Sequence, residues 1–89
     1  MLRDPVTAYV ALGANLGQAR AAVLQALQAL ASISGTQVTG RSALYRTAPH
    51  EAQGPDFINA VARIDTRLTF ADMAAKFRAE DRRLAALAT

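Results

Sequence analysis

The stretch Pro55-Asp56-Phe57-Ile58-Asn59-Ala60-Val61-Ala62-Arg63-Ile64 decides how this chain folds. Successive side chains of a β-strand point to opposite faces of its sheet. On one face of such a strand lie only apolar groups, those of Ile58, Ala60, Ala62 and Ile64. On the other lie Phe57, Asn59, Val61, Arg63 and Asp65. The stretch therefore predicts a strand, running to about Thr66, with one face in the core and one turned away from it.

The second face of this strand places an aromatic ring two residues from a carboxamide. A ring can stack on a flat heterocycle, and a carboxamide offers that heterocycle one acceptor and two donors. Phe57 and Asn59 are therefore candidate ligand-binding residues. A half-exposed sheet face that binds nothing explains the same pair, so the pair alone leaves both interpretations open.

The composition is that of one small globular domain covering residues 1–89, with 52% hydrophobic and 19% charged residues. The chain has no cysteine, which excludes disulfides and thiolate metal sites and fits a reducing compartment. Its first residues do not resemble a signal peptide, and its apolar runs are too short to cross a bilayer. We therefore expect a soluble, cytoplasmic protein without a membrane partner.

The charge balance is basic, with a formal net charge of +3 and arginine at all but one of the ten basic positions. Such a balance suits an anionic ligand such as a polyphosphate, or a nucleic acid. One basic cluster comprises Lys76, Arg78, Arg82 and Arg83, and a solvated helix face explains it equally well. The predicted open face lacks a second aromatic and a basic stripe, so no nucleic-acid partner is expected.

The rest of the chain reads as alternating strands and helices. The apolar run Val6–Leu12, which ends at Gly13, predicts a buried strand. Asn15 and Gln18 predict the N-cap of an amphipathic helix that continues to about Ala31. Residues 36–46 predict a second strand with a bulge at Gly40, and residues 47–56 predict a loop.

A second helix is predicted after Thr69 and Asp72, which form a capping pair. Its apolar stripe would hold Phe70, Met73, Ala74, Phe77, Leu84 and Leu87. Glu80 and Asp81 stand where this stripe should continue, and a buried carboxylate is costly unless it is paired. Either these acids have a function, or both turn outward beside Arg78 or Arg83.

This order of elements indicates an α+β sandwich with both helices on one face of a sheet that is rich in antiparallel pairs. A further strand would normally complete a split βαβ arrangement of this kind.

The sequence contains no familiar catalytic, metal-binding or phosphate-binding motif. His50 is the only histidine, no paired aspartates suit a metal, and the turn Gly13-Ala14-Asn15-Leu16-Gly17 is neither a dinucleotide fingerprint nor a Walker loop.

Three segments together resemble a known family. They are Ala8-Tyr9-Val10-Ala11-Leu12-Gly13-Ala14-Asn15-Leu16-Gly17, Ser42-Ala43-Leu44-Tyr45-Arg46-Thr47-Ala48-Pro49 and Pro55-Asp56-Phe57-Ile58-Asn59-Ala60-Val61. Their order and separations are similar to those of 6-hydroxymethyl-7,8-dihydropterin pyrophosphokinase, an enzyme of folate biosynthesis. The resemblance covers residues from about 7 to 80.

The resemblance implies a ferredoxin-like fold and transfer of a pyrophosphoryl group from ATP to the hydroxymethyl oxygen of a pterin. By position, Phe57 matches the aromatic that stacks on the pterin, and Asn59 matches the amide that pairs with its polar edge. Thr47 and the backbone of Ala48, Pro49 and His50 match the loop that hydrogen-bonds the ring. Glu80 matches an acid on the adenosine side of the ATP site.

The chain departs from the family pattern after Glu80, where Asp81-Arg82-Arg83-Leu84-Ala85-Ala86 replaces an expected glycine-arginine step. Family members are much longer, and their second half would hold the last strand, the Mg²⁺-binding aspartates and the phosphate-binding arginines. Pyrophosphoryl transfer depends on such positioning and charge. We therefore expect a truncated pyrophosphokinase domain of doubtful activity. The alternative is an inactive pterin-binding remnant, or a module that associates with itself through the open edge of Val6–Leu12.

Overall fold

A computed structural model describes the backbone of residues 3–50 and 54–88 and the side chains of these residues up to residue 81. Six elements follow one another: β1 (Val6–Ala14), α1 (Ala19–Ala31), β2 (Thr36–Arg41), β3 (Tyr45–Thr47), β4 (Phe57–Thr66) and α2 (Phe70–Ala88). This order confirms the predicted α+β class. The predicted contributions of Arg82, Arg83, Leu84 and Leu87 concern side chains outside the described residues.

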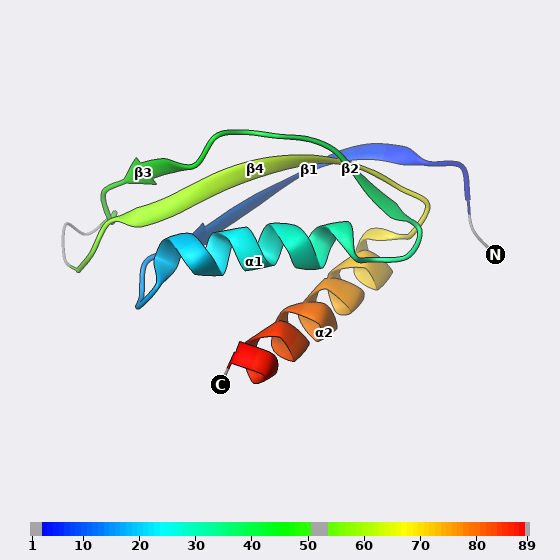
Figure 1. The fold of residues 1–89 in the computed structure, drawn as a ribbon. Helices are drawn as coiled ribbons and strands as arrows, with labels where there is room; N and C mark the ends of the chain where they lie inside the picture. Colours follow the sequence, from blue (N-terminus) through cyan, green and yellow to red (C-terminus); the bar gives the residue numbers. More distant parts are fainter. Residues whose placement is uncertain (1–2, 51–53, 89) are drawn as a thin grey trace.

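The sheet is built around β4. β1 pairs antiparallel with it on one side, from Val6 opposite Thr66 to Ala14 opposite Ile58, and β2 and β3 pair antiparallel with it on the other side. β1 and β2 therefore run parallel with β4 between them, and α1 connects them. Figure 1 shows α1 and α2 on the same side of the sheet. This is the split βαβ arrangement of the expected ferredoxin-like fold.

The core lies between the helices and the inner face of β4. Ala60, Ala62 and Ile64 are completely buried in it, each with 0% of its surface exposed. The buried side chains that surround them are those of Val23, Leu27, Leu30, Ile33, Leu68 and Met73. On the opposite face Phe57, Asn59 and Val61 are half-buried and Arg63 is exposed. The predicted orientation of this strand is therefore confirmed. We call the side of the sheet without helices the open face.

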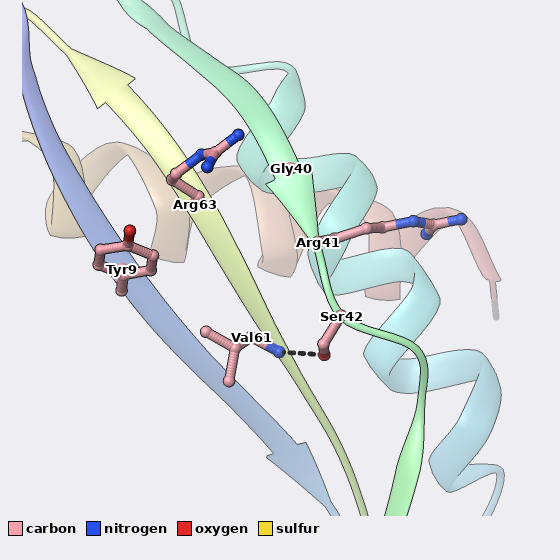
Figure 2. Close-up of a pocket in the computed structure, with 6 residues that line it drawn as sticks. All are labelled: Tyr9, Gly40, Arg41, Ser42, Val61 and Arg63. Atoms are coloured by element: carbon pink, nitrogen blue, oxygen red, sulfur yellow. Dashed lines mark hydrogen bonds between the residues drawn. The ribbon is translucent and has the colours of Figure 1, made fainter.

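The predicted second strand is wrong at its centre. β2 ends at Arg41 and β3 begins at Tyr45. The ladder is interrupted at Ser42, which is bonded to β4 by one backbone hydrogen bond and one side-chain hydrogen bond in place of two backbone bonds. Its N–H donates to the Val61 carbonyl at 2.8 Å, and its Oγ accepts from the Val61 N–H at 2.9 Å (Figure 2). The bulge was correctly expected, since the register with β4 shifts between Val38 and Gly40.

The boundaries of β1 and α1 also differ from the prediction. β1 continues through Gly13 to Ala14, and α1 begins only at Ala19. No residue of β1 is fully buried, so the predicted buried strand is wrong, because β1 lies at the edge of the sheet with helices on one face only. Gln18 occupies the N-cap position without a side-chain hydrogen bond, so the predicted Asn15 cap is wrong. The reason is that Gly17, with φ at 58°, turns the chain before the helix begins, so that Gln18 and not Asn15 directly precedes the first turn. The Asn15 Nδ2 instead donates to the Pro55 carbonyl at 3.5 Å.

The start of α2 is partly as predicted. The Thr69 Oγ1 accepts the Asp72 N–H at 3.2 Å, which confirms the capping pair. Met73 is buried, but Phe70 is 79% exposed, so its place in the apolar stripe is wrong. Phe70 lies in the first turn, where the helix has just left the end of β4, and the buried stripe begins one turn later. Ala31 at the end of α1 is likewise exposed.

Two features of the fold bear on partners. Among the described residues β1 pairs only with β4, so its outer edge has no strand beside it. Self-association through this edge stays a prediction. None of the helices in the described part of the chain has the length and apolar character needed to span a membrane.

Because Ile64 is fully buried, Ile64→Ala should lower the free energy of unfolding by about 2–5 kcal/mol, the range for large-to-small changes in a core. Val6→Ala is the matched control, since Val6 lies on the same sheet but is 47% exposed, and should cost well under half as much. Urea denaturation followed by circular dichroism measures both. Equal losses would show that this face of β4 does not carry the core.

Candidate functional site

The pairing of β3 with β4 brings three of the predicted site residues together on the open face. Thr47 lies opposite Phe57 in the register, and Tyr45 lies opposite Asn59. Thr47 therefore belongs to a strand, not to the loop in which the sequence placed it. The ladder holds its side chain beside that of Asn59, so these site residues lie on a sheet.

The Asn59 carboxamide is oriented by two hydrogen bonds across the sheet. Its Nδ2 donates to the Thr47 Oγ1 at 2.8 Å and to the Tyr45 carbonyl at 3.4 Å. Both amide donors are therefore used within the protein. The Asn59 Oδ1 remains as an acceptor, and the Thr47 hydroxyl, which accepts from Asn59, keeps its own proton to donate. The pair offers a ligand one acceptor and one donor side by side.

Gly13 is a part of this site that the sequence analysis missed. It lies directly opposite Asn59 on β1, and a Cβ added to it would stand 2.9 Å from the Asn59 Oδ1. Real Cβ atoms essentially never approach so closely, so glycine is required if the amide is to keep this position. The available signal was a glycine inside a strand, which often marks a close approach of other groups.

The other predicted residues of the pterin loop follow Thr47 directly. Ala48 and His50 are exposed and Pro49 is half-buried. The structure places them next to Thr47 by chain connectivity alone. The predicted use of their backbone groups therefore remains a prediction.

Glu80 lies on α2 and so on the opposite side of the sheet from Asn59. It is half-buried, whereas Asp81 is exposed, so only Asp81 turns fully outward. A cavity of about 250 Å³ lies beside this part of α2, between Phe77 and Asp81 on one side and Gly13 at the end of β1 on the other. The acidic part of α2 and the Asn59 site thus share one end of the sheet, although not one face.

The described residues do not form a magnesium site. No group of three or more His, Cys, Asp or Glu side chains within the described parts of the chain could hold a metal ion. The described residues therefore do not fit the metal that the family resemblance implies.

Comparison with known proteins decides the family. Residues 9–86 match the family model of 7,8-dihydro-6-hydroxymethylpterin-pyrophosphokinase. The chain belongs to this family. The match runs a little beyond residue 80, where the resemblance in the sequence was expected to stop.

Curated relatives carry the matching name, 2-amino-4-hydroxy-6-hydroxymethyldihydropteridine pyrophosphokinase. The chain is 40% identical over 65 residues to the protein of Haemophilus influenzae, covering 72% of this chain and 41% of that one. It is 44% identical over 63 residues to the protein of Methylorubrum extorquens, covering 70% and 40%. It is 39% identical over 66 residues to the protein of Pseudomonas aeruginosa, covering 73% of this chain and 41% of that one. The matched region thus spans about two-fifths of the length of these relatives.

Gly13→Ala should displace the Asn59 carboxamide, because the new methyl group would occupy the place of Oδ1. We expect altered chemical shifts for the Asn59 side-chain NH₂ group and a loss of about 0.5–1.5 kcal/mol in stability if its bond to Thr47 breaks. NMR spectra and urea denaturation measure the two effects.

A double-mutant cycle gives the control for this prediction. Once Asn59→Ala has removed the amide, adding Gly13→Ala should cost much less than it does alone, because the two residues are in contact. Additive costs would show that Gly13 does not make room for Asn59.

Proposed function

We propose that this chain carries the pterin-binding part of a 6-hydroxymethyl-7,8-dihydropterin pyrophosphokinase of folate biosynthesis, within a single domain of residues 1–89. The observation that carries the proposal is the hydrogen bond from Asn59 to Thr47 on the open face. Asn59 lies on the same strand as Phe57, two residues along β4. Family membership and the names of the relatives support the reaction class.

The polar groups of the site suit the edge of a pterin. This edge alternates N–H donors with nitrogen and oxygen acceptors, so it can meet an acceptor and a donor that stand side by side. In the proposed complex the Asn59 Oδ1 accepts from a pterin N–H, and the Thr47 hydroxyl donates to an adjacent acceptor. A ligand that fits needs no rearrangement of the amide, because Thr47 and Tyr45 already hold it.

Phe57 supplies the apolar part of the proposed site. It is half-buried, so part of its ring is anchored by the protein and part can stack on the flat heterocycle. Phenylalanine has no hydroxyl group and adds no hydrogen bond. Carbonyl groups of residues 48–50 and the N–H groups of Ala48 and His50 would bond the remaining ring edge, whereas Pro49 has no N–H to offer.

In the proposed reaction the hydroxymethyl oxygen of the bound pterin attacks the β-phosphorus of ATP. The bond from this phosphorus to the oxygen that bridges it to the α-phosphate breaks, and AMP leaves. Glu80 would serve the adenosine side, at the same end of the sheet as Asn59. The groups that hold Mg²⁺ and the triphosphate are proposed to belong to the part of the family sequence that this chain does not match.

Phe57→Ala and Asn59→Ala should each weaken binding of 6-hydroxymethyl-7,8-dihydropterin by about fivefold or more, since stacking and an uncharged hydrogen bond are each worth roughly 1 kcal/mol or more. Isothermal titration calorimetry measures the affinity. Tyr9→Ala is the matched control, because Tyr9 is an aromatic on the open face with 70% exposure, four residues along β1 from Gly13. Unchanged affinity in both site variants would contradict the proposed pterin site.

Turnover separates the pyrophosphokinase from the inactive pterin-binding remnant. The chain supplied with ATP, Mg²⁺ and hydroxymethyldihydropterin should bind the pterin but form no AMP, because the described residues offer no metal site. Chromatographic measurement of AMP tests this expectation. Formation of AMP at a rate abolished by Asn59→Ala would show that residues 1–89 suffice for the reaction.

The cytoplasmic location remains a prediction from the sequence.

A further inference from the structure

Arg63 is held in a fixed position on the open face. Its Nε donates to the Thr39 Oγ1 at 3.0 Å, and its Nη2 donates to the Thr39 carbonyl at 3.2 Å. The Thr39 hydroxyl in turn donates to the Arg63 carbonyl at 3.2 Å. A planar guanidinium that is bonded along one edge presents its remaining N–H groups in one direction. Exposed arginines without such bonds lose more side-chain freedom when they bind a ligand.

The bulge between β2 and β4 creates this arrangement. Thr39 is the residue that the register skips between Val38 and Gly40, and bulges commonly re-aim a side chain in this way. A Cβ at Gly40 would lie 3.3 Å from the Arg63 Nη2, closer than most real Cβ contacts. Figure 2 shows the Arg63 side chain reaching toward Gly40. The bulge and the glycine therefore let the guanidinium lie flat against β2.

A cavity of about 360 Å³ opens beside this guanidinium. It is lined by Tyr9, Gly40, Arg41, Ser42, Val61 and Arg63. Tyr9 lies directly opposite Arg63 in the register of β1 and β4. Its ring borders the cavity, whereas Arg41 turns its side chain toward α1 (Figure 2). The cavity thus has one cation and one aromatic ring with a hydroxyl group on the open face. The expectation that this face lacks a second aromatic is therefore wrong, because the register places the exposed Tyr9 on it.

Arg63 has no ion-pair partner among the residues whose side chains are described. The nearest acid on its own strand and face is Asp65, whose Oδ1 accepts from the Thr7 hydroxyl at 2.8 Å, across on β1. Arg63 therefore lines the cavity with no carboxylate bonded to it among the described side chains, and a guanidinium in this position favours an oxygen anion as ligand.

We propose that Arg63, positioned by Thr39 and Gly40, forms with Tyr9 an oxyanion-binding site for a phosphate or carboxylate group. Arg63 is four residues from Asn59 along β4, which is about 13 Å in an extended strand. The two sites are therefore separate and can be filled at the same time. This inference does not rest on the proposed pterin site.

Titration of the ¹⁵N-labelled chain with inorganic phosphate, and separately with acetate, tests the proposal at constant ionic strength. At least one anion should shift the Gly40 amide and the Arg63 Nε–H resonances saturably, with a dissociation constant on the order of millimolar, as suits a single guanidinium. The anion that binds more tightly shows which oxyanion the site prefers. Arg63→Gln should weaken this binding by about tenfold. Thr39→Val should weaken it by a smaller factor.

Arg20→Gln is the matched control, because Arg20 is an exposed arginine on α1 and its loss should leave the titration unchanged. Arg63→Lys keeps the charge without the planar fork and should bind with intermediate affinity. Shifts that do not saturate, or that persist unchanged in Arg63→Gln, would overturn the proposal. Calorimetry with hydroxymethyldihydropterin keeps the two proposals apart, since Arg63→Gln should bind the pterin as the unmodified chain does.

Discussion

The burial of alternate side chains of β4 is the constraint on which the rest of the structure depends. Ala60, Ala62 and Ile64 are completely removed from solvent, and two of the three are small, which lets the helices approach the central strand closely. Because the strand has a period of two, fixing these residues in the core also fixes Asn59 and Arg63 on the open face. A register slip by one residue would bury the amide and the guanidinium and expose the isoleucine. The hydrophobic energy of the core therefore positions polar groups that contribute little to it.

The neighbouring strands then give each polar group of β4 its own surroundings. Near the start of β4, the short strand β3 supplies Thr47 and β1 supplies the empty space at Gly13, so the Asn59 amide lies flat and bonded. Further along, the bulge in β2 supplies Thr39 and the space at Gly40, so the Arg63 guanidinium lies flat and bonded. Both positions use the same device, a hydroxyl group on one neighbouring residue and a missing side chain on another. Preorganisation of this kind reduces the entropy that a ligand must remove on binding.

Periodicity and capping patterns were sufficient to predict the fold class, the faces of β4 and the Thr69 cap, because these depend on residues that are close in sequence. The Phe57–Asn59 pair was also visible, as neighbours on one face of one strand. The break at Ser42 was not, because it depends on a bond to Val61 across the sheet. The roles of Gly13 and Thr39 were missed for the same reason, since each becomes meaningful only when the register brings it to Asn59 or Arg63. The Asn15 cap failed because a local pattern competed with a turn at Gly17.

The distribution of side chains on β1 explains why the two polar positions can act separately. On the open face this strand carries Thr7, Tyr9, Ala11 and Gly13 opposite Asp65, Arg63, Val61 and Asn59. Apolar Ala11 and Val61 therefore lie between the amide and the guanidinium. Their side chains offer no hydrogen bonds that could link the two groups. A flat heterocycle at the amide end would meet a polar rim and an aromatic ring, whereas an anion at the other end would meet a cation and a phenol. The chemical difference between the ends follows from which residue of β1 the register places opposite each residue of β4.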